Sequence, residues 1–436
     1  MLTGERVRGN GVIIQILKLR LLAFIFLLLA ATQAMASVIA SIEFIGNKNT
    51  QAFVLLQEMR SQVGDELDIA TVKEDVQAIM DLHLFRDVKY SVYDSISKNN
   101  VRLVIRVTEK HYLFVLPEIR VDEVDKALHY GVRAYWDNIA GTNQSLRLKL
   151  REYGETLGVQ DIRQSLEYTM PRIDGSPYTL NFFTEYRESV IEYSAADPQF
   201  RQEKKIGFNV DRWRHLDNRS SGWYLGTGLY REERNNSALY DGDVSLADLQ
   251  GNFLQLRFGY QKINEYLFNR RGKDFGYILN TNRILFNEED RFTKHLIFYR
   301  SYYRLKSHPM NNLNVQMQLG ASDGDYLGDN VFSLGGSELR GYSERGLYNG
   351  NAMVLMNIEY LVPFSNNPAY RYGVLLDVGN AYDRAKDIDF KGLHTTIGLA
   401  FRWKVAAFVK VNIRLDIGYA TDTGDSNIIL NSRHLF

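Results

Sequence analysis

The chain has 436 residues, enough for one large domain and a small one, and its 52 basic and 52 acidic side chains give no argument for a nucleic-acid partner. The absence of cysteine excludes disulfides and thiolate metal sites. Tyr and Phe are abundant (27 and 23) and Pro is scarce (7), which suits a chain of strands with aromatic belts better than a loop-rich enzyme.

Residues 1–36 are typical of a secretory signal peptide. A basic start precedes an apolar run, Leu21 to Ala31, and an Ala-Met-Ala motif ends at Ala36. We expect cleavage there and a mature chain that starts at Ser37. The alternative is an uncleaved anchor helix, but the apolar run is short for a span that needs about 20 residues. Later segments lack the composition of a transmembrane helix, so any further membrane part must be a barrel.

Residues 37–110 alternate between strand and helix patterns. Strands are predicted over 38–44, 88–94 and 101–109, and helices over 52–60 and 70–85. The order β-α-α-β-β indicates a small α+β domain. An unrelated α+β module would show the same order.

This stretch resembles a POTRA domain, the periplasmic module of outer-membrane assembly proteins. The matching residues include Gly46-Asn47, Gly64 and the closing strand that ends at Glu109. His83 departs from the family, which usually has glycine there. A small sheet leaves an unpaired edge that can accept an extended segment. The resemblance implies that the domain receives unfolded polypeptide in the periplasm.

Residues 111–436 carry period-2 patterns that predict a transmembrane β-barrel. Apolar and polar side chains alternate over 145–151, 254–261, 313–320 and 411–419. A soluble sandwich also alternates, but here one face is crowded with charge and the other is large and apolar, and several runs reach the 9 to 11 residues that a spanning strand needs. In lipid such a sheet must close.

We expect about 16 antiparallel strands, at about 20 residues for each strand with its connection. Residues 172–178 are predicted to be a tight turn and residues 231–251 a long polar loop. The terminal Phe436, at the end of an alternating strand, resembles the recognition signal of bacterial outer-membrane barrels.

The segment "LGGSELRGYSERG" (334–346) is rich in glycine, which is typical of phosphate-binding loops. Gly336 and Gly341 have the P-loop spacing, but Tyr342 stands where the P-loop has lysine, and no helix pattern follows. A nucleophile elbow is excluded because Leu339 replaces its final glycine. The segment must therefore be interpreted from its surroundings.

Residues 332–364 resemble the most characteristic region of the BamA/TamA-type outer-membrane assembly superfamily, also called the bacterial surface antigen family. Its hallmark is an Arg-Gly-aromatic tip on the sixth outer loop, after a Gly-Gly pair. A second motif, aromatic-x-Asp-x-Gly, follows 37 positions later, with Leu375 in place of the aromatic residue. The matching positions here are Gly335, Gly336, Arg340, Gly341, Tyr342, Asp377 and Gly379.

The two motifs predict a loop that is anchored inside the barrel. An arginine offers a planar fork of donors that a carboxylate accepts in bidentate fashion, and glycine allows positive φ and close approach. We expect Arg340 to pair with Asp377 in the lumen. The alternative is an exposed arginine that is unpaired or pairs with Glu338 or Glu344.

The resemblance implies a non-enzymatic protein of the bacterial outer membrane that inserts or translocates other polypeptides. Its expected partners are unfolded outer-membrane or secreted polypeptides and the lipid bilayer, with periplasmic chaperones or accessory proteins as further candidates. By analogy, residues 112–121 and the C-terminal strand form a weak seam. Pro117 removes a ladder donor from the first strand and Gly418 thins the penultimate one.

Two other functions stay open. One is a dedicated secretion pore for a single partner protein, and the other is a passive porin-like channel. A lipase of the patatin type would need a catalytic domain for which residues 1–36 leave no room. No metal or cofactor is expected, because His83 and His394 show no ligand spacing. His111 and Tyr112, at the predicted domain junction, are expected to pack.

Overall fold

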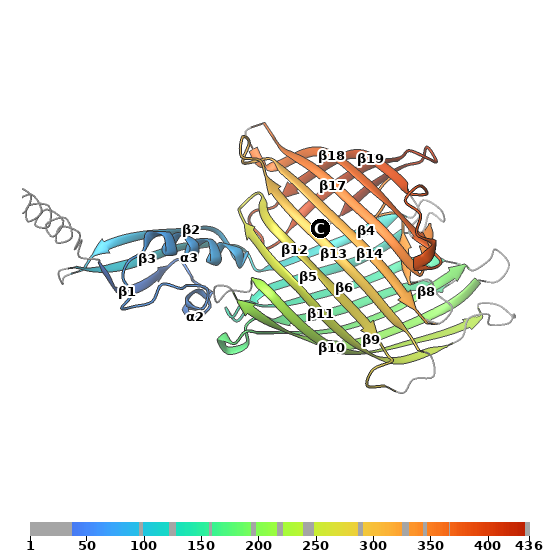
Figure 1. Cartoon of the computed structure of the whole chain (residues 1–436), viewed down its shortest axis with the longest axis horizontal. Helices are drawn as coiled ribbons and strands as arrows, with labels where there is room; N and C mark the ends of the chain where they lie inside the picture. Colours follow the sequence, from blue (N-terminus) through green and yellow to red (C-terminus); the bar gives the residue numbers. More distant parts are fainter. Residues whose placement is uncertain are drawn as a thin grey trace, which may run out of the picture.

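The computed structural model describes a small α+β domain next to one end of a large β-barrel (Figure 1). It describes residues 37–431, except the segments 96–98, 122–127, 157–158, 193–197, 216–220, 239–247, 287–290, 325–330, 343–346 and 366. The predicted signal segment, its cleavage site between Ala36 and Ser37, and Phe436 therefore lie outside the described residues or at their border.

The small domain has a three-stranded sheet in the order β1-β3-β2, with β1 and β3 parallel. Its elements, in chain order, are β1 (Val38–Ile45), α2 (Ala52–Leu56), α3 (Ile69–Asp81), β2 (Phe85–Asp94) and β3 (Asn100–Glu109). Inward residues of the sheet pack on the apolar face of α3, where Val72 and Ile79 are fully buried. This is the predicted β-α-α-β-β order.

Helix α2 is shorter than the predicted 52–60. The amides of Glu58 and Met59 donate only three residues back, and the next two amides leave the helix altogether. Arg60 N and Ser61 N donate to the carboxylate of Asp75 on α3, at 2.8 and 3.1 Å, and the Ser61 hydroxyl donates to it at 2.6 Å. A buried carboxylate on one helix thus ends the other.

We expect Asp75→Ala to destabilise the small domain by about 3 kcal/mol, because it leaves buried donors without an acceptor. Its side chain is fully buried. Glu74→Ala is the matched control, since Glu74 is half exposed in its 3.2 Å pair with Arg60 and should change stability very little. Pulse proteolysis of the domain in the intact protein across a urea series measures both. Equal urea midpoints would contradict the prediction.

The barrel sheet has 16 strands, which confirms the predicted fold and strand number. Its strands are β4 (Leu113–Val121), β5 (Leu128–Ile139), β6 (Gln144–Thr156), β7 (Val159–Met170), β8 (Tyr178–Glu192), β9 (Pro198–His215), β10 (Gly222–Ala238), β11 (Leu249–Glu265), β12 (Arg270–Thr281), β13 (Thr293–Arg304), β14 (Asn312–Asp323), β17 (Ala352–Phe364), β18 (Asn367–Tyr382), β19 (His394–Lys404), β20 (Asn412–Ala420) and β21 (Ser426–Asn431). Each pairs antiparallel with its neighbour, and β14 pairs with β17 across a long connection.

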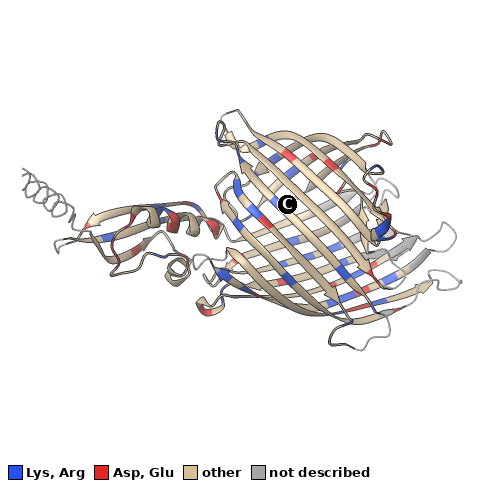
Figure 2. Cartoon of the chain, viewed as in Figure 1, with Lys and Arg blue, Asp and Glu red and all other residues tan. Residues whose placement is uncertain are grey.

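Side chains alternate between the outer face and the lumen, as the sequence patterns predict. On β9 and β10, Ile206 and Leu225 point outward and are 62% and 64% exposed, whereas Asn209 faces inward and is 8% exposed. Charged residues are distributed along the strands and are not confined to the turns (Figure 2). An apolar exterior around a polar interior is the pattern of a barrel in lipid.

The two predicted connections fare differently. Residues 172–178 form the expected tight turn, with a 3-10 turn, η1 (Ile173–Gly175), and left-handed backbone at Arg172 and Asp174. The prediction that residues 231–251 are one long loop is wrong. β10 continues to Ala238 and β11 starts at Leu249. Polar side chains do not interrupt the ladder of a strand that lines the lumen or extends beyond it.

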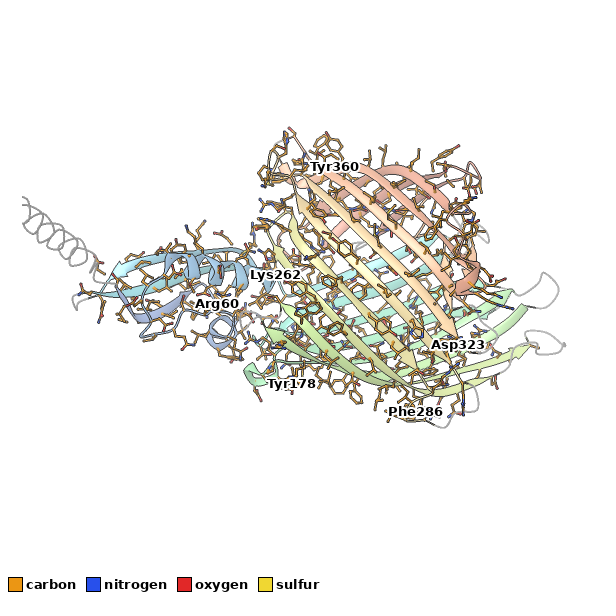
Figure 3. All side chains as sticks on the ribbon, in the orientation of Figure 1. Arg60, Tyr178, Lys262, Phe286, Asp323 and Tyr360 are labelled. Atoms are coloured by element: carbon orange, nitrogen blue, oxygen red, sulfur yellow. The ribbon has the colours of Figure 1, made fainter. Side chains whose placement is uncertain are left out.

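The described sheet ends at β4 and β21, and the described residues contain no ladder between them. The start of β4 is held by the β19–β20 turn: His111 N donates to Ala407 O at 2.7 Å, and the rings of Phe114 and Phe408 pack at a tilt of 56° with 4.8 Å between centroids. Tyr178 and Tyr360 lie at the barrel end next to the small domain, and Asp323 lies at the far end (Figure 3).

Among the residues that the structure describes, no helix combines the length and hydrophobicity that crossing a membrane requires.

Candidate functional site

The connection between β14 and β17 folds back into the barrel at the end far from the small domain. It contains a short hairpin, β15 (Phe332–Leu334) with β16 (Tyr348–Gly350). Gly335 and Gly336 follow β15 with φ of 130° and 56°, a region that favours glycine. The tip beyond them is buried, and its apolar residues pack against the barrel wall together with Met353 and Leu355.

Arg340, at the tip of this loop, lies against Asp377 of β18. Its Nε and Nη2 donate to the two carboxylate oxygens at 2.9 and 2.6 Å, and its backbone amide donates to the same carboxylate at 3.0 Å. Both side chains are fully buried. Asn357 on β17 also donates to Asp377 at 2.8 Å and to the carbonyl of Glu338 at 2.8 Å. The predicted pair is therefore in bidentate contact.

A second carboxylate, from Glu359 on β17, binds Nη1 of Arg340 at 2.5 Å and also pairs with Arg402 of β19. Asp416 of β20 pairs with Arg402 at 2.6 Å and with Arg414 at 3.0 Å. The two sequence motifs include none of Glu359, Arg402, Arg414 and Asp416. In the sequence, Arg402, Arg414 and Asp416 are recognisable only as charged residues that alternate with apolar neighbours along predicted strands.

We call these six residues the lumen ion cluster: Arg340, Glu359, Asp377, Arg402, Arg414 and Asp416. It contains three cations and three carboxylates, all at most 7% exposed in their side chains. The three positive and three negative charges balance. Arg340 of the loop therefore neutralises the excess negative charge that the cluster members on strands β17 to β20 would otherwise carry. Removal of one member of a buried group of this kind leaves a charge uncompensated, which costs about 3 to 5 kcal/mol.

Glycines in the wall let the loop backbone approach it closely. A side chain at Gly418 on β20 would place its Cβ 2.3 Å from Arg340 O, and one at Gly341 would place it 2.5 Å from Ala420 N. The interpretation of Gly418 as a weak point of the penultimate strand therefore misses its contact: it makes room for the loop. A Cβ at Gly379 on β18 would lie 2.7 Å from Val354 O of the neighbouring strand β17, so this glycine allows close packing within the wall.

Tyr342 extends the anchor to the last strands. Its hydroxyl donates to Asp422 in the β20–β21 turn, and its carbonyl accepts from the Asn427 side chain of β21 at 3.0 Å. His394 at the start of β19 also pairs with Asp422, at 2.5 Å, and stacks on Tyr348 at 3.7 Å between centroids. The loop tip thus bonds directly to the strand that ends the sheet.

Among the alternatives for Arg340, Glu344 lies outside the described residues. The Glu338 side chain accepts from the Ser337 hydroxyl at 2.8 Å.

Comparison with known proteins identifies the family. The model described as "Omp85 superfamily domain" matches residues 138–429, two thirds of the chain, which include the whole lumen ion cluster. The chain belongs to the Omp85 superfamily. The POTRA model, described as "Surface antigen variable number repeat", matches residues 37–110, the small domain. This superfamily places the chain in the bacterial outer membrane, with the POTRA domain in the periplasm, among proteins that handle polypeptides at that membrane.

Solved structures share the fold at low sequence identity. BamA from Haemophilus ducreyi lacking POTRA domains 1–3 is 17% identical, with a TM-score of 0.54 and coverage of 90% of this chain and 83% of that chain. CdiB from Escherichia coli is 12% identical, with a TM-score of 0.64 and coverage of 91% and 75%. CdiB from Acinetobacter baumannii is 11% identical, with a TM-score of 0.56 and coverage of 91% and 73%. None of the curated proteins matches this Omp85 chain.

The POTRA domain docks on periplasmic turns of the barrel. Asn138, at the end of β5, donates to the Thr50 hydroxyl at 2.9 Å, and Arg172 of the β7–β8 turn pairs with Glu58 at 2.8 Å. Tyr112 lies in the linker between β3 and β4, residues 110–112. It also contacts the Thr50 hydroxyl, at 3.0 Å, and packs against the core of the small domain, as expected. These contacts hold α2 and the linker against the rim.

Helix α3 makes the other half of this junction. Glu265 N, at the end of β11, donates to Asp81 at 2.7 Å, and Gln77 donates to Glu265 O at 2.9 Å. His83, the departure from the family pattern, has φ of 66°, which explains the glycine usually found there. Its Nδ1 lies 3.7 Å from the Glu265 carboxylate, and its carbonyl accepts from Lys110 at 2.8 Å.

The junction is expected to weaken as pH falls. Burial holds the pKa of His83 well below its usual value, and four nearby cations lower it further: Lys410, Arg270, Lys110 and Lys404. Glu265 does not offset this effect, because its carboxylate already pairs with Arg270. The imidazole of His83 therefore binds a proton more readily in the undocked state than in the docked state. Its contribution to the stability of the docked junction is complete above about pH 6.5 and is lost as the pH falls below that value. Burial lowers the pKa of Lys110 to about 7, which favours docking increasingly as pH rises above 7.

Trypsin cleavage of the linker in the intact protein tests this. We expect faster cleavage at pH 5.5 than at pH 8 after correction for the activity of trypsin on a reference peptide. The part of the change between pH 6.5 and 5.5 should disappear in His83→Gln. A corrected rate that is independent of pH would contradict the prediction.

Proposed function

We propose that this protein is a non-enzymatic outer-membrane machine that inserts other polypeptides into the membrane or moves them across it. In this proposal the POTRA domain receives unfolded clients, and the loop pinned by Arg340 keeps the last strands of the barrel in place. The observation that carries it is the loop anchor itself. A balanced, fully buried ion cluster fixes the loop to β17–β20, and Tyr342 joins it to β21.

The free edge of the POTRA sheet supports client reception. Strand β2 pairs only with β3 among the described residues, so its outer backbone groups are available for an added strand. The other edge is partly covered, because Gly64 N donates to Ile39 O and Ile39 N donates to Asp65 O. We therefore assign client pairing to β2.

The ends of the barrel sheet support lateral release of clients into lipid. β4 contains Pro117, which lacks a ladder donor, and among the described residues β4 and β21 share no ladder. Two strands without a shared ladder separate at a low cost, and the Asn427 contact with the loop would regulate that cost.

Deletion of the gene followed by proteomics of the outer membrane and the medium tests the function. We expect a reduced amount of a subset of barrel proteins, restored by the wild-type gene. Loss of one secreted protein with unchanged barrel levels would instead indicate a dedicated secretion pore. Unchanged proteomes together with ion conductance of the purified protein would indicate a passive channel, and either result would reject the insertion proposal.

A further inference from the structure

A small cavity lies in the barrel wall at the periplasmic end of the lumen, between the ends of β12–β14 and β17–β20. Its volume is about 40 Å³, room for two or three water molecules or one carboxylate group. Four cationic side chains line it: Arg270, Arg371, Arg402 and Lys404. Four asparagines contribute polar groups, and the lining contains no carboxylate among the described residues.

Among the residues that the structure describes, two of the four cations have a carboxylate partner. Arg270 pairs with Glu265 at 2.7 Å, and Arg402 pairs with members of the lumen ion cluster. The carboxylates of that cluster are shared with Arg340 and Arg414, so they leave no negative charge to spare.

The other two cations are uncompensated. Arg371 is 7% exposed and donates to neutral carbonyls, at 2.8 Å to Met310 O and 3.3 Å to Phe268 O. Lys404 is half-buried, and the described residues place no carboxylate within ion-pair distance of it. An arginine bonded to carbonyls is held in place but keeps its full charge. The cavity therefore carries an excess of two positive charges in a confined space, which is costly without an anion.

Lys110 of the POTRA domain adds positive charge at the same mouth at pH values below about 7, where its ammonium group is protonated. Lys110, at the end of the domain, is 8% exposed and lies close enough to Lys404 and Lys410 to interact with them electrostatically. A segment handed from the POTRA sheet into the lumen would pass this cationic surface first. The field along this path attracts acidic groups.

We propose that this cavity binds a side-chain or terminal carboxylate of a polypeptide that enters the barrel from the periplasm, with Lys404 and Arg371 as its charge partners. The inference rests on the proposed function, since it names the chemistry by which a client is held. The cavity has room for one carboxylate on a narrow stem, and its lining offers cations and amides but no competing carboxylate among the described residues.

Peptide binding to the purified full-length protein in detergent tests the site. The probes are two fluorescein-labelled peptides of equal length, one with glutamate and the other with glutamine at alternate positions, both with amidated C-termini. We expect the glutamate peptide to bind at least tenfold more tightly in polarisation measurements. Lys404→Gln should weaken its binding about tenfold, or about 1.4 kcal/mol, and Lys404→Arg should restore most of the affinity.

Lys391→Gln, in an exposed turn at the opposite end of the barrel, is the charge-matched control and should bind like wild type. Equal affinity for both peptides, or an unaffected Lys404→Gln variant, would overturn the proposal. If inorganic phosphate raises the unfolding temperature of wild type but not of Lys404→Gln, and neither peptide binds, the cavity is a site for free anions. This outcome also overturns the proposal. Intact peptide binding with an unchanged proteome after gene deletion would reject the proposed function and keep the site.

Discussion

Arg340→Ala is expected to release the loop from the barrel wall and to lower stability by about 3 to 5 kcal/mol. The substitution leaves the carboxylates of Asp377, Glu359 and Asp416 buried with two arginines between them, and it removes three donors from Asp377 and Glu359. Limited proteolysis in isolated outer membranes should show cleavage within 334–346, and heat-modifiable electrophoretic mobility should show a lower unfolding temperature.

Two variants control this result. Arg283→Ala removes an arginine from an exposed 3.0 Å pair with Asp323 at the same end of the barrel and should leave both readouts unchanged. Arg340→Lys keeps the charge but loses the bidentate geometry, so it should give an intermediate result. If Arg340→Ala keeps wild-type protection of the loop and wild-type activity, the loop does not depend on this anchor.

Gly418→Ala is expected to displace the same loop without removing any charge. The added Cβ would lie 2.3 Å from Arg340 O and 2.6 Å from Gly341 N, and both neighbours are backbone atoms, so the loop or β20 must move. We expect a loss of about 1 to 3 kcal/mol. Loop cleavage should increase, and the contact between Asn427 and Tyr342 O should weaken with it.

Gly392→Ala is the matched glycine control. Its added Cβ would have no neighbour closer than 3.9 Å, so protease sensitivity and unfolding temperature should stay at wild-type values. A Gly418→Ala protein with a fully protected loop would show that the close approach of loop and wall is not needed. Comparison of Gly418→Ala with Arg340→Ala separates the steric contribution to loop anchoring from the electrostatic one.

Much of the architecture can be read from the sequence, because strand alternation is a local property. The alternation over 254–261 and 313–320 predicts strands that the structure contains in β11 and β14. The length of the chain after residue 110 predicts about 16 strands, the number observed. The prediction of a single loop over 231–251 is wrong, since polarity alone does not distinguish a loop from a strand with solvent on one or both faces.

The site was only partly predictable. Arg340 and Asp377 carry family motifs, so their pairing could be expected from the sequence. Arg402 and Asp416 carry no motif, and each looks like any charged residue that alternates with apolar neighbours. Sheet register decides their role: Arg402 pairs opposite Arg414, Asp416 lies opposite Ala400, and all three charged side chains point inward.

The sequence by itself determined the strand and helix pattern, the apolar exterior of the barrel and the two motifs that meet in the lumen, because these depend on the residue types along a single segment. Tertiary structure decided the charge balance of the ion cluster, the space at Gly418 and the cationic cavity around Lys404. These depend on side chains from strands up to about 130 residues apart, from Arg270 to Arg402, and on which charges already have partners. Burial turns such charges from solvated side chains into groups that need a specific partner, and only the closed sheet produces that burial.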